Sequence, residues 1–190
     1  MSGLFALAAA CILGQSAQAT TYYWDTNGTT AGSGVSTGTM GSAMFWSTDS
    51  SGSIAPTVTT TTTSDDLNFS AGSNGTAGTV TVSGVQSAGS LTFAQPGAIT
   101  LTSGTISLGT GAITQSSGAG ANIINSTILF NGNTITNNST SALTLGGGEY
   151  KFRDVDDRRG GHRDSDRSQL VWHGRRFHRF WQHGLLGSGA

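Results

Sequence analysis

Short runs of alternating aliphatic and hydroxyl residues recur between Thr79 and Leu145, and they restrict the fold more than any other feature of the chain. An alternation with a period of two places Val, Leu, Ile and Phe on one face of a strand and Thr or Ser on the other. Gly, Ser and Asn separate the runs, as expected for turns. The runs are residues 79–82, 90–93, 98–101, 105–108, 112–114, 127–130, 133–136 and 142–145.

Strands this short, joined by such short connections, are compatible with three all-β architectures: hairpin meanders, a sandwich or a parallel β-solenoid. Each run supplies too few inward residues for a wide sandwich face, and Asn131-Gly132 is the main two-residue hairpin signal. In a solenoid every coil stacks on the coil before it, so that narrow apolar stripes join into one core. We therefore predict a β-solenoid over residues 65–148, with about three or four coils of roughly 20–25 residues each.

Several Asn residues lie near the expected corners of these coils. One interpretation is that their side chains stack and bond to one another along the axis, as they do in cross-β ladders. The alternative is that each occupies a turn in the left-handed αL conformation. The residues are Asn122, Asn125, Asn131, Asn133, Asn137 and Asn138.

The first residues predict a secretory signal peptide over residues 1–19. Residues 4–13 are apolar but too few to span a bilayer, and Ala17-Gln18-Ala19 is typical of a cleavage site. We expect a signal helix that is removed after export through the inner membrane, which leaves a mature chain without a transmembrane segment. No Lys or Arg follows Met1, so we expect the natural start to lie upstream. The alternatives are a buried apolar helix and a lipid anchor at Cys11.

Residues 20–64 are less regular and contain two aromatic clusters, residues 22–24 and 45–46. We predict that this segment is an irregular β region that caps the solenoid, because the first coil would otherwise expose its apolar stripe. The alternative is that Trp24 and Trp46 stack on sugar rings.

All the positive charge follows Tyr150, with nine Lys/Arg and four His in the last part of the chain. We predict that residues 149–190 form a disordered basic tail, because they have no clear period. One hypothesis for its origin is translation of the same repeat in the wrong frame, since a shift of one base permits a Gly-, Ser- and Thr-rich sequence from Arg175 onward. The alternatives are a genuine tail and a functional basic segment, although we expect no nucleic-acid partner.

No cluster of residues indicates catalysis, a cofactor or a metal ion. Polysaccharide lyases and hydrolases need clustered acids or bases at the substrate. Asp65 and Asp66 are adjacent, so in a strand they point to opposite faces and cannot act as a pair. The remaining acids of residues 20–148 are Asp25 and Asp49. We therefore predict no enzyme activity, no cofactor and no metal site.

The opening sequence Tyr22-Tyr23-Trp24-Asp25-Thr26-Asn27-Gly28 is followed by Phe45-Trp46-Ser47 and Ala55-Pro56, and later by residues 66–70 and 87–93. This set resembles the start of secreted bacterial proteins built from autotransporter-associated β-strand repeats, over about residues 20–148. The resemblance implies a right-handed parallel β-helix, a passenger-like surface or secreted role, and no cofactor. Proteins of that family are usually much longer, so we expect this chain to be a truncated or frameshifted fragment.

Taken together, these features predict a non-catalytic, adhesin-like structural module that is secreted or held at the cell surface, with association with the outer membrane as a further option. The alternative is a carbohydrate-binding or polysaccharide-degrading β-helix fragment. The expected partner is a cell-surface or extracellular polysaccharide.

Overall fold

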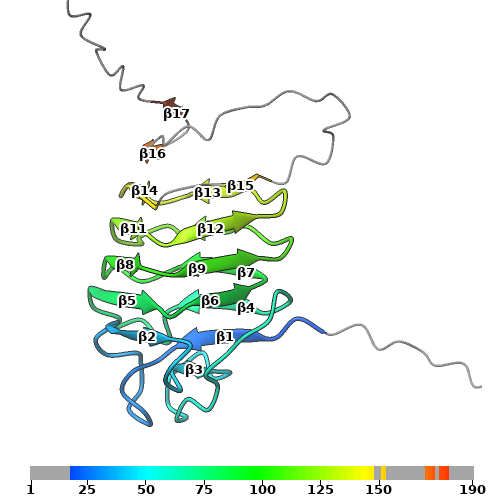
Figure 1. The fold of residues 1–190 in the computed structure, drawn as a ribbon. Helices are drawn as coiled ribbons and strands as arrows, with labels where there is room; N and C mark the ends of the chain where they lie inside the picture. Colours follow the sequence, from blue (N-terminus) through cyan, green and yellow to red (C-terminus); the bar gives the residue numbers. More distant parts are fainter. Residues whose placement is uncertain (1–17, 148–150, 153–169, 174–175, 180–190) are drawn as a thin grey trace, which may run out of the picture.

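The computed structural model describes residues 18–147, 151–152, 170–173 and 176–179. These residues form strands and loops, with no helix among them. Each turn of the chain contributes one strand to each of three sheets, and successive turns stack into a solenoid (Figure 1). The predicted all-β solenoid is therefore confirmed. The predicted signal helix falls on residues 1–17, which lie outside the described residues, and it stays a prediction.

The three sheets are named here by the order of their strands along the chain. Sheet 1 holds β1 (Thr21–Trp24), β4 (Asp66–Phe69), β7 (Ser90–Phe93), β10 (Ile113–Gln115) and β13 (Ile135–Asn137), with β3 (Trp46–Ser47) at one edge. Sheet 2 holds β2 (Gly38–Met40), β5 (Gly78–Val82), β8 (Ile99–Thr102), β11 (Asn122–Ile124) and β14 (Leu143–Leu145), followed at its far edge by β16 (Leu170–His173) and β17 (Arg176–Arg179). Sheet 3 holds β6 (Val85–Ala88), β9 (Thr105–Leu108), β12 (Thr127–Phe130) and β15 (Lys151–Phe152).

Successive coils are parallel and in register. In sheet 1, Leu67, Leu91, Ile113 and Ile135 occupy the same place in successive coils. This register agrees with the expected coil length of roughly 20–25 residues. The complete coils are β4-β5-β6, β7-β8-β9, β10-β11-β12 and β13-β14-β15. An incomplete coil of β1 and β2 precedes them, and the loop that follows β2 contains β3, which pairs antiparallel with β1.

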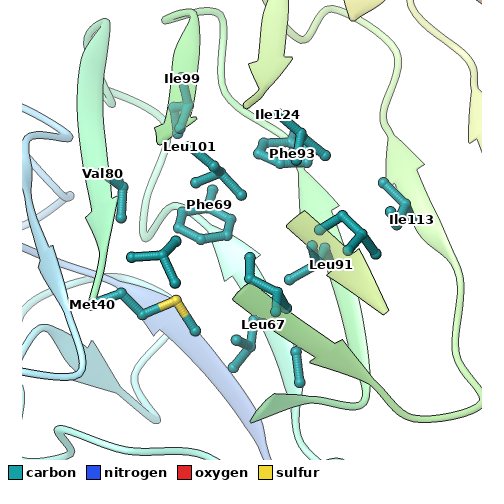
Figure 2. Close-up of a cluster of buried hydrophobic side chains, with 14 of the residues drawn as sticks. Met40, Leu67, Phe69, Val80, Leu91, Phe93, Ile99, Leu101, Ile113 and Ile124 are labelled. Atoms are coloured by element: carbon teal, nitrogen blue, oxygen red, sulfur yellow. The ribbon is translucent and has the colours of Figure 1, made fainter. Parts of the chain in front are cut away.

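The alternation in the sequence sets which side chains enter the core. In β9, for example, Ile106 and Leu108 are buried while Thr105 and Ser107 are half-buried on the outside. Side chains from sheets 1 and 2 meet in a continuous column, in which Leu67, Leu91 and Leu101 are each 0% exposed (Figure 2). Complete burial of a Leu or Ile side chain contributes about 1.5–3 kcal/mol. The core therefore grows by addition of similar coils.

The sharp corner between β8 and β9 depends on a Ser-Gly pair. Ser103 and Gly104 both have positive φ, 62° and 48°. A Cβ added to Gly104 would lie 2.4 Å from the carbonyl oxygen of Val82 in the preceding coil. Only glycine satisfies both the backbone conformation and the close approach.

The described residues of the predicted tail form strands. β15 pairs parallel with β12, and β16 (Leu170–His173) pairs antiparallel with both β14 and β17 (Arg176–Arg179). The rest of residues 149–190 lies outside the described residues. Disorder of that remainder and out-of-frame translation stay predictions.

Candidate functional site

Five aromatic rings pack together at the N-terminal end of the solenoid. The centroid of the Trp24 ring lies 5.0 Å from that of Trp46, in an edge-to-face arrangement, and 5.0 Å from that of Phe45. Phe69 lies 5.3 Å from Trp46 and stacks on Phe93, also at 5.3 Å. Such ring pairs are worth about 0.5–1.5 kcal/mol beyond their burial. The cluster thus joins the incomplete first coil and the loop after it to the next two coils.

Trp24 and Trp46, the residues predicted for sugar stacking, are both 0% exposed. A ring that stacks on a sugar needs an open face, and neither ring has one here. Their indole N–H groups are also buried and have no hydrogen-bond partner. Both side chains therefore lie where a cap would require them, and carbohydrate binding by this chain stays a prediction.

Asp25 follows Trp24 directly and its side chain is also 0% exposed. Its Oδ1 accepts a hydrogen bond from the backbone N–H of Asn27 at 2.9 Å, whereas its Oδ2 has no partner. Burial raises the pKa of Asp25, although the bond from Asn27 opposes this effect and the negative charge of Asp49 adds to it. Because no Lys, Arg or His occurs before Lys151, the fold holds this carboxyl without a nearby basic residue from that part of the chain.

Asp49 organises the loop between β3 and the next coil. Its carboxylate accepts bonds from the Ser51 hydroxyl at 2.7 and 2.9 Å and from the backbone N–H groups of Ser51, Ser53 and Ile54. These bonds, led by that from the Ser51 hydroxyl, lower the pKa of Asp49. The two acids near the N-terminal end therefore have opposite pKa shifts.

Asp65 and Asp66 accept hydrogen bonds from different parts of the chain, Asp65 within a turn and Asp66 from the next strand of sheet 1. Asp65 accepts hydrogen bonds from the backbone N–H groups of Thr20 and Thr62 and from the Thr62 hydroxyl, and Asp66 accepts one from the Ser90 hydroxyl at 2.6 Å. Within the part of the chain that the structure describes, no group of three or more His, Cys, Asp or Glu residues could hold a metal ion. The described acids are thus engaged in local structure or isolated.

The outward faces of the sheets carry hydroxyl side chains in register. In sheet 2, Thr79 and Thr81 of β5 lie beside Thr100 and Thr102 of β8. On the other side of β5, Thr39 lies beside Thr81, and Thr37, which directly precedes β2, accepts a hydrogen bond from the Thr79 N–H at 3.3 Å. This array was not predicted from the sequence, because Gly38 interrupts the aliphatic pattern there. The spacing Thr-x-Thr at residues 37–39, 79–81 and 100–102 is the signal that identifies it.

In sheet 1 the corresponding outward column contains Asn68, Thr92, Thr114 and Thr136. Asp66 lies on the same strand as Asn68, so this face carries a charge. In contrast, the outward residues of sheet 2 in β2, β5, β8, β11 and β14 include no ionisable side chain. The two faces share Thr ladders and differ in charge.

Comparison with known proteins shows a similarity to an autotransporter adhesin. The chain is 35% identical over 136 residues to the adhesin BmaC autotransporter of Brucella suis biovar 1 (strain 1330), a match that covers 72% of this chain and 4% of that protein. No family model and no solved structure matches the chain. The fold and this similarity together define an autotransporter-like β-helix. Within the described residues, no helix is long and apolar enough to cross a membrane.

Proposed function

We propose that this chain is a non-catalytic, adhesin-like module of a secreted or cell-surface protein, built as a right-handed β-helix of autotransporter-associated repeats. The observation that carries the proposal is its similarity to an autotransporter adhesin, at 35% identity over 136 residues. The stacked, in-register coils support the same role, because a solenoid extends by adding coils and presents long, repetitive side faces.

The use of the acidic residues supports a non-catalytic role. Asp49, Asp65 and Asp66 accept hydrogen bonds from nearby turns or from the next coil. Glycosidic hydrolysis uses two carboxyl groups on opposite sides of one bond. Carboxyl groups that already accept such hydrogen bonds serve the fold instead.

Export is part of the proposal and has its own test. A signal peptide over residues 1–19 would deliver the chain through the inner membrane, with surface retention or secretion to follow. Expression of the full chain in a Gram-negative host, followed by fractionation and protease digestion of intact cells, measures its location. Protein in the surface or culture fraction, cleaved before Thr20, is expected. Retention of uncleaved chain in the cytoplasm would contradict the proposal.

Adhesion is tested by displaying the full chain on a non-adherent bacterial host and counting the cells that attach to host-cell monolayers or to immobilised polysaccharides. The matched control is Leu101→Asp, which places a charge in the core and unfolds the coils while surface expression is followed by an epitope tag. Attachment above the control is expected. Release of sugar products from any polysaccharide would refute the non-catalytic assignment and favour the degrading β-helix alternative.

The origin of residues 149–190 is tested on the coding DNA. We expect that the next reading frame continues the Gly-, Ser- and Thr-rich repeat, which would make the present chain a frameshifted fragment of a longer solenoid. A shifted frame that encodes no such repeat would establish the basic tail as genuine.

A further inference from the structure

The outward face of sheet 2 carries a two-column array of Thr side chains. One column contains Thr37, Thr79 and Thr100, and the other contains Thr39, Thr81 and Thr102. The three strands involved lie above one another in successive layers (Figure 1). The array therefore extends over three neighbouring strand segments, each of which presents two hydroxyl and two methyl groups.

The spacing of this array follows from strand geometry. Neighbouring parallel strands lie about 4.7–4.9 Å apart, and residues two apart along a strand are separated by about 6.6 Å. Thr is β-branched, so few χ1 rotamers are open to each side chain. The hydroxyl and methyl groups thus repeat in two dimensions with little freedom to move, and the repeats lie in the range of the oxygen spacings on the faces of an ice crystal.

Exposure and charge fit a neutral, ordered partner. Thr37 and Thr79 are exposed, and Thr39, Thr81, Thr100 and Thr102 are half-buried, with the intervening Val80 and Leu101 fully inside. No charged side chain interrupts the array, whereas Asp66 lies on the outward face of sheet 1. A charged group would orient water radially around itself and would disturb a regular lattice.

We propose that this Thr face of sheet 2 binds ice, by holding water molecules in positions that merge with the crystal lattice. This activity goes beyond the surface role proposed above, because it belongs to the purified chain wherever the chain is located. The methyl groups would sit in the gaps of the water layer, and the hydroxyls would hydrogen-bond to its molecules. A rigid solenoid has already lost the conformational freedom that a flexible surface would lose on binding.

The extent of the array sets the expected strength. In the next coil Ile123 lies beside Thr100, and Asn125 directly follows β11, so that coil lacks the Thr pair. Thr144 of β14 lies beside Ile123 and restores one hydroxyl. Three such strand segments make a small face, so we expect slowed ice recrystallisation and modest thermal hysteresis. Ile123→Thr should increase both, because it joins Thr100 to Thr144 in one uninterrupted column.

The test uses the full purified chain and two matched variants. Thr100→Lys places a charge in the centre of the sheet 2 face, and Thr92→Lys places the same charge in the outward column of sheet 1. Circular dichroism checks that both variants retain the fold. Thermal hysteresis, recrystallisation inhibition and incorporation of labelled protein into a growing ice hemisphere are then measured.

We expect the wild-type chain and Thr92→Lys to enter the ice, and Thr100→Lys to be excluded with loss of thermal hysteresis. Exclusion of the wild-type chain, at the level of an inert control protein, would overturn the proposal. Equal activity of the two Lys variants would overturn the assignment to sheet 2. If the wild-type chain is excluded from ice but binds crystalline cellulose in a manner that Thr100→Lys abolishes, the face binds a polymer surface and the ice proposal fails. None of these outcomes depends on where the cell sends the protein.

Discussion

The first, incomplete coil and the regular coils after it fill their interiors in different ways. At the N-terminal end, Trp24 and Trp46 pack edge to face with each other, Phe69 packs edge to face with Trp46, and an antiparallel strand closes the edge of sheet 1. From β5 onward in sheet 2, the interior holds aliphatic side chains in register, such as Val80, Leu101 and Ile124.

The difference follows from the number of neighbours that each coil has. A middle coil is covered on both sides by coils of the same width, so in sheet 2 aliphatic side chains of similar size suffice. Within the described residues no coil precedes the first one, and large rings from β1 and from the loop after β2 fill the space at its end. The same end holds Asp25, whose carboxyl is fully buried and half-satisfied. In sheet 2 the regular coils repeat the same aliphatic packing, whereas the N-terminal end combines an aromatic cluster, an antiparallel strand and a buried carboxyl.

The largest expected effect concerns the aromatic cluster. Trp24→Ala should reduce the free energy of unfolding by about 3–5 kcal/mol, because it removes a fully buried ring and leaves a cavity. In solenoids each repeat contacts only its neighbours, so the loss should be local. Hydrogen exchange should show reduced protection in β1 and β4 while β11 and β12 remain protected. Equal loss of protection in all coils would mean that the end and the coils form a single cooperative unit.

A core substitution in the middle coils provides the matching measurement. Leu101→Ala should cost about 2–5 kcal/mol in urea denaturation, since Leu101 is fully buried between Val80 and Ile124. Thr102→Ala is the control, because this neighbour faces outward and should change stability by no more than about 0.5 kcal/mol. Hydrogen exchange should here lose protection on both sides of β8. A loss confined to β8 would show that the regular coils are less cooperative than their registers imply.

Two glycine substitutions measure what the close approach between neighbouring coils contributes at the corners of the regular coils. Gly104→Ala should cost about 2–4 kcal/mol, because the added Cβ combines left-handed strain with overpacking against Val82. Gly118 also has positive φ, 79°, but a Cβ there meets nothing within 4 Å. Gly118→Ala should therefore cost only the left-handed strain, about 1–2 kcal/mol. Thermal unfolding of the two variants separates the close approach between coils from backbone strain alone, and equal costs would show that the approach contributes nothing.

The regular coils were the predictable part of this molecule. Thr105–Leu108 alternates without interruption, and an uninterrupted period of two leaves one choice of inward face. The Gly, Ser and Asn residues between the runs also predicted the corners correctly, as at Ser103-Gly104. Coil length then followed from the spacing of similar runs.

The buried amides were not predictable from the same pattern. Asn122 is 1% exposed, its Oδ1 accepts a bond from the Ile99 N–H at 2.8 Å, and its Nδ2 donates to Gln115 Oε1 at 3.0 Å. The interpretation of stacked Asn side chains does not describe Asn122, because it bonds to a Gln side chain and to the backbone of a neighbouring coil. The interpretation of an αL turn does not describe it either, because among the described residues Ser103 is the non-glycine residue with positive φ. Its partners come together only after the coils stack, so the sequence around residue 122 contains no local sign of its burial.

The candidate site also has a part that the sequence predicted and a part that it did not. The aromatic character of Trp24 and Trp46 pointed to a special end, but whether the rings faced sugar or core depended on residues far away, such as Phe69 and Phe93. Asp25 was missed because an acid in an aromatic segment normally faces water. Its burial results from the loop that packs over it, where the Asp25 N–H donates to the carbonyl oxygen of Phe45 at 2.9 Å.

The smallest expected effect separates the two acids at the end. Asp25→Asn should raise stability at pH 7 by about 1 kcal/mol, because it removes a buried charge and keeps the oxygen that accepts from Asn27. The pKa of Asp25 is higher in the folded than in the unfolded state. The protonated side chain therefore contributes its full stability at a pH below the unfolded pKa, and this stability is lost as pH rises through the folded pKa. Urea midpoints of the wild type and the variant should therefore converge in acid and separate toward neutral pH. Asp49→Asn should also match the wild type in acid but be less stable than it at neutral pH, since the contribution of a carboxyl with a lowered pKa is present at neutral pH and is lost as pH falls through its folded pKa. If both variants shifted the urea midpoint in the same direction at neutral pH, burial at the N-terminal end would not be what distinguishes Asp25 from the half-buried Asp49.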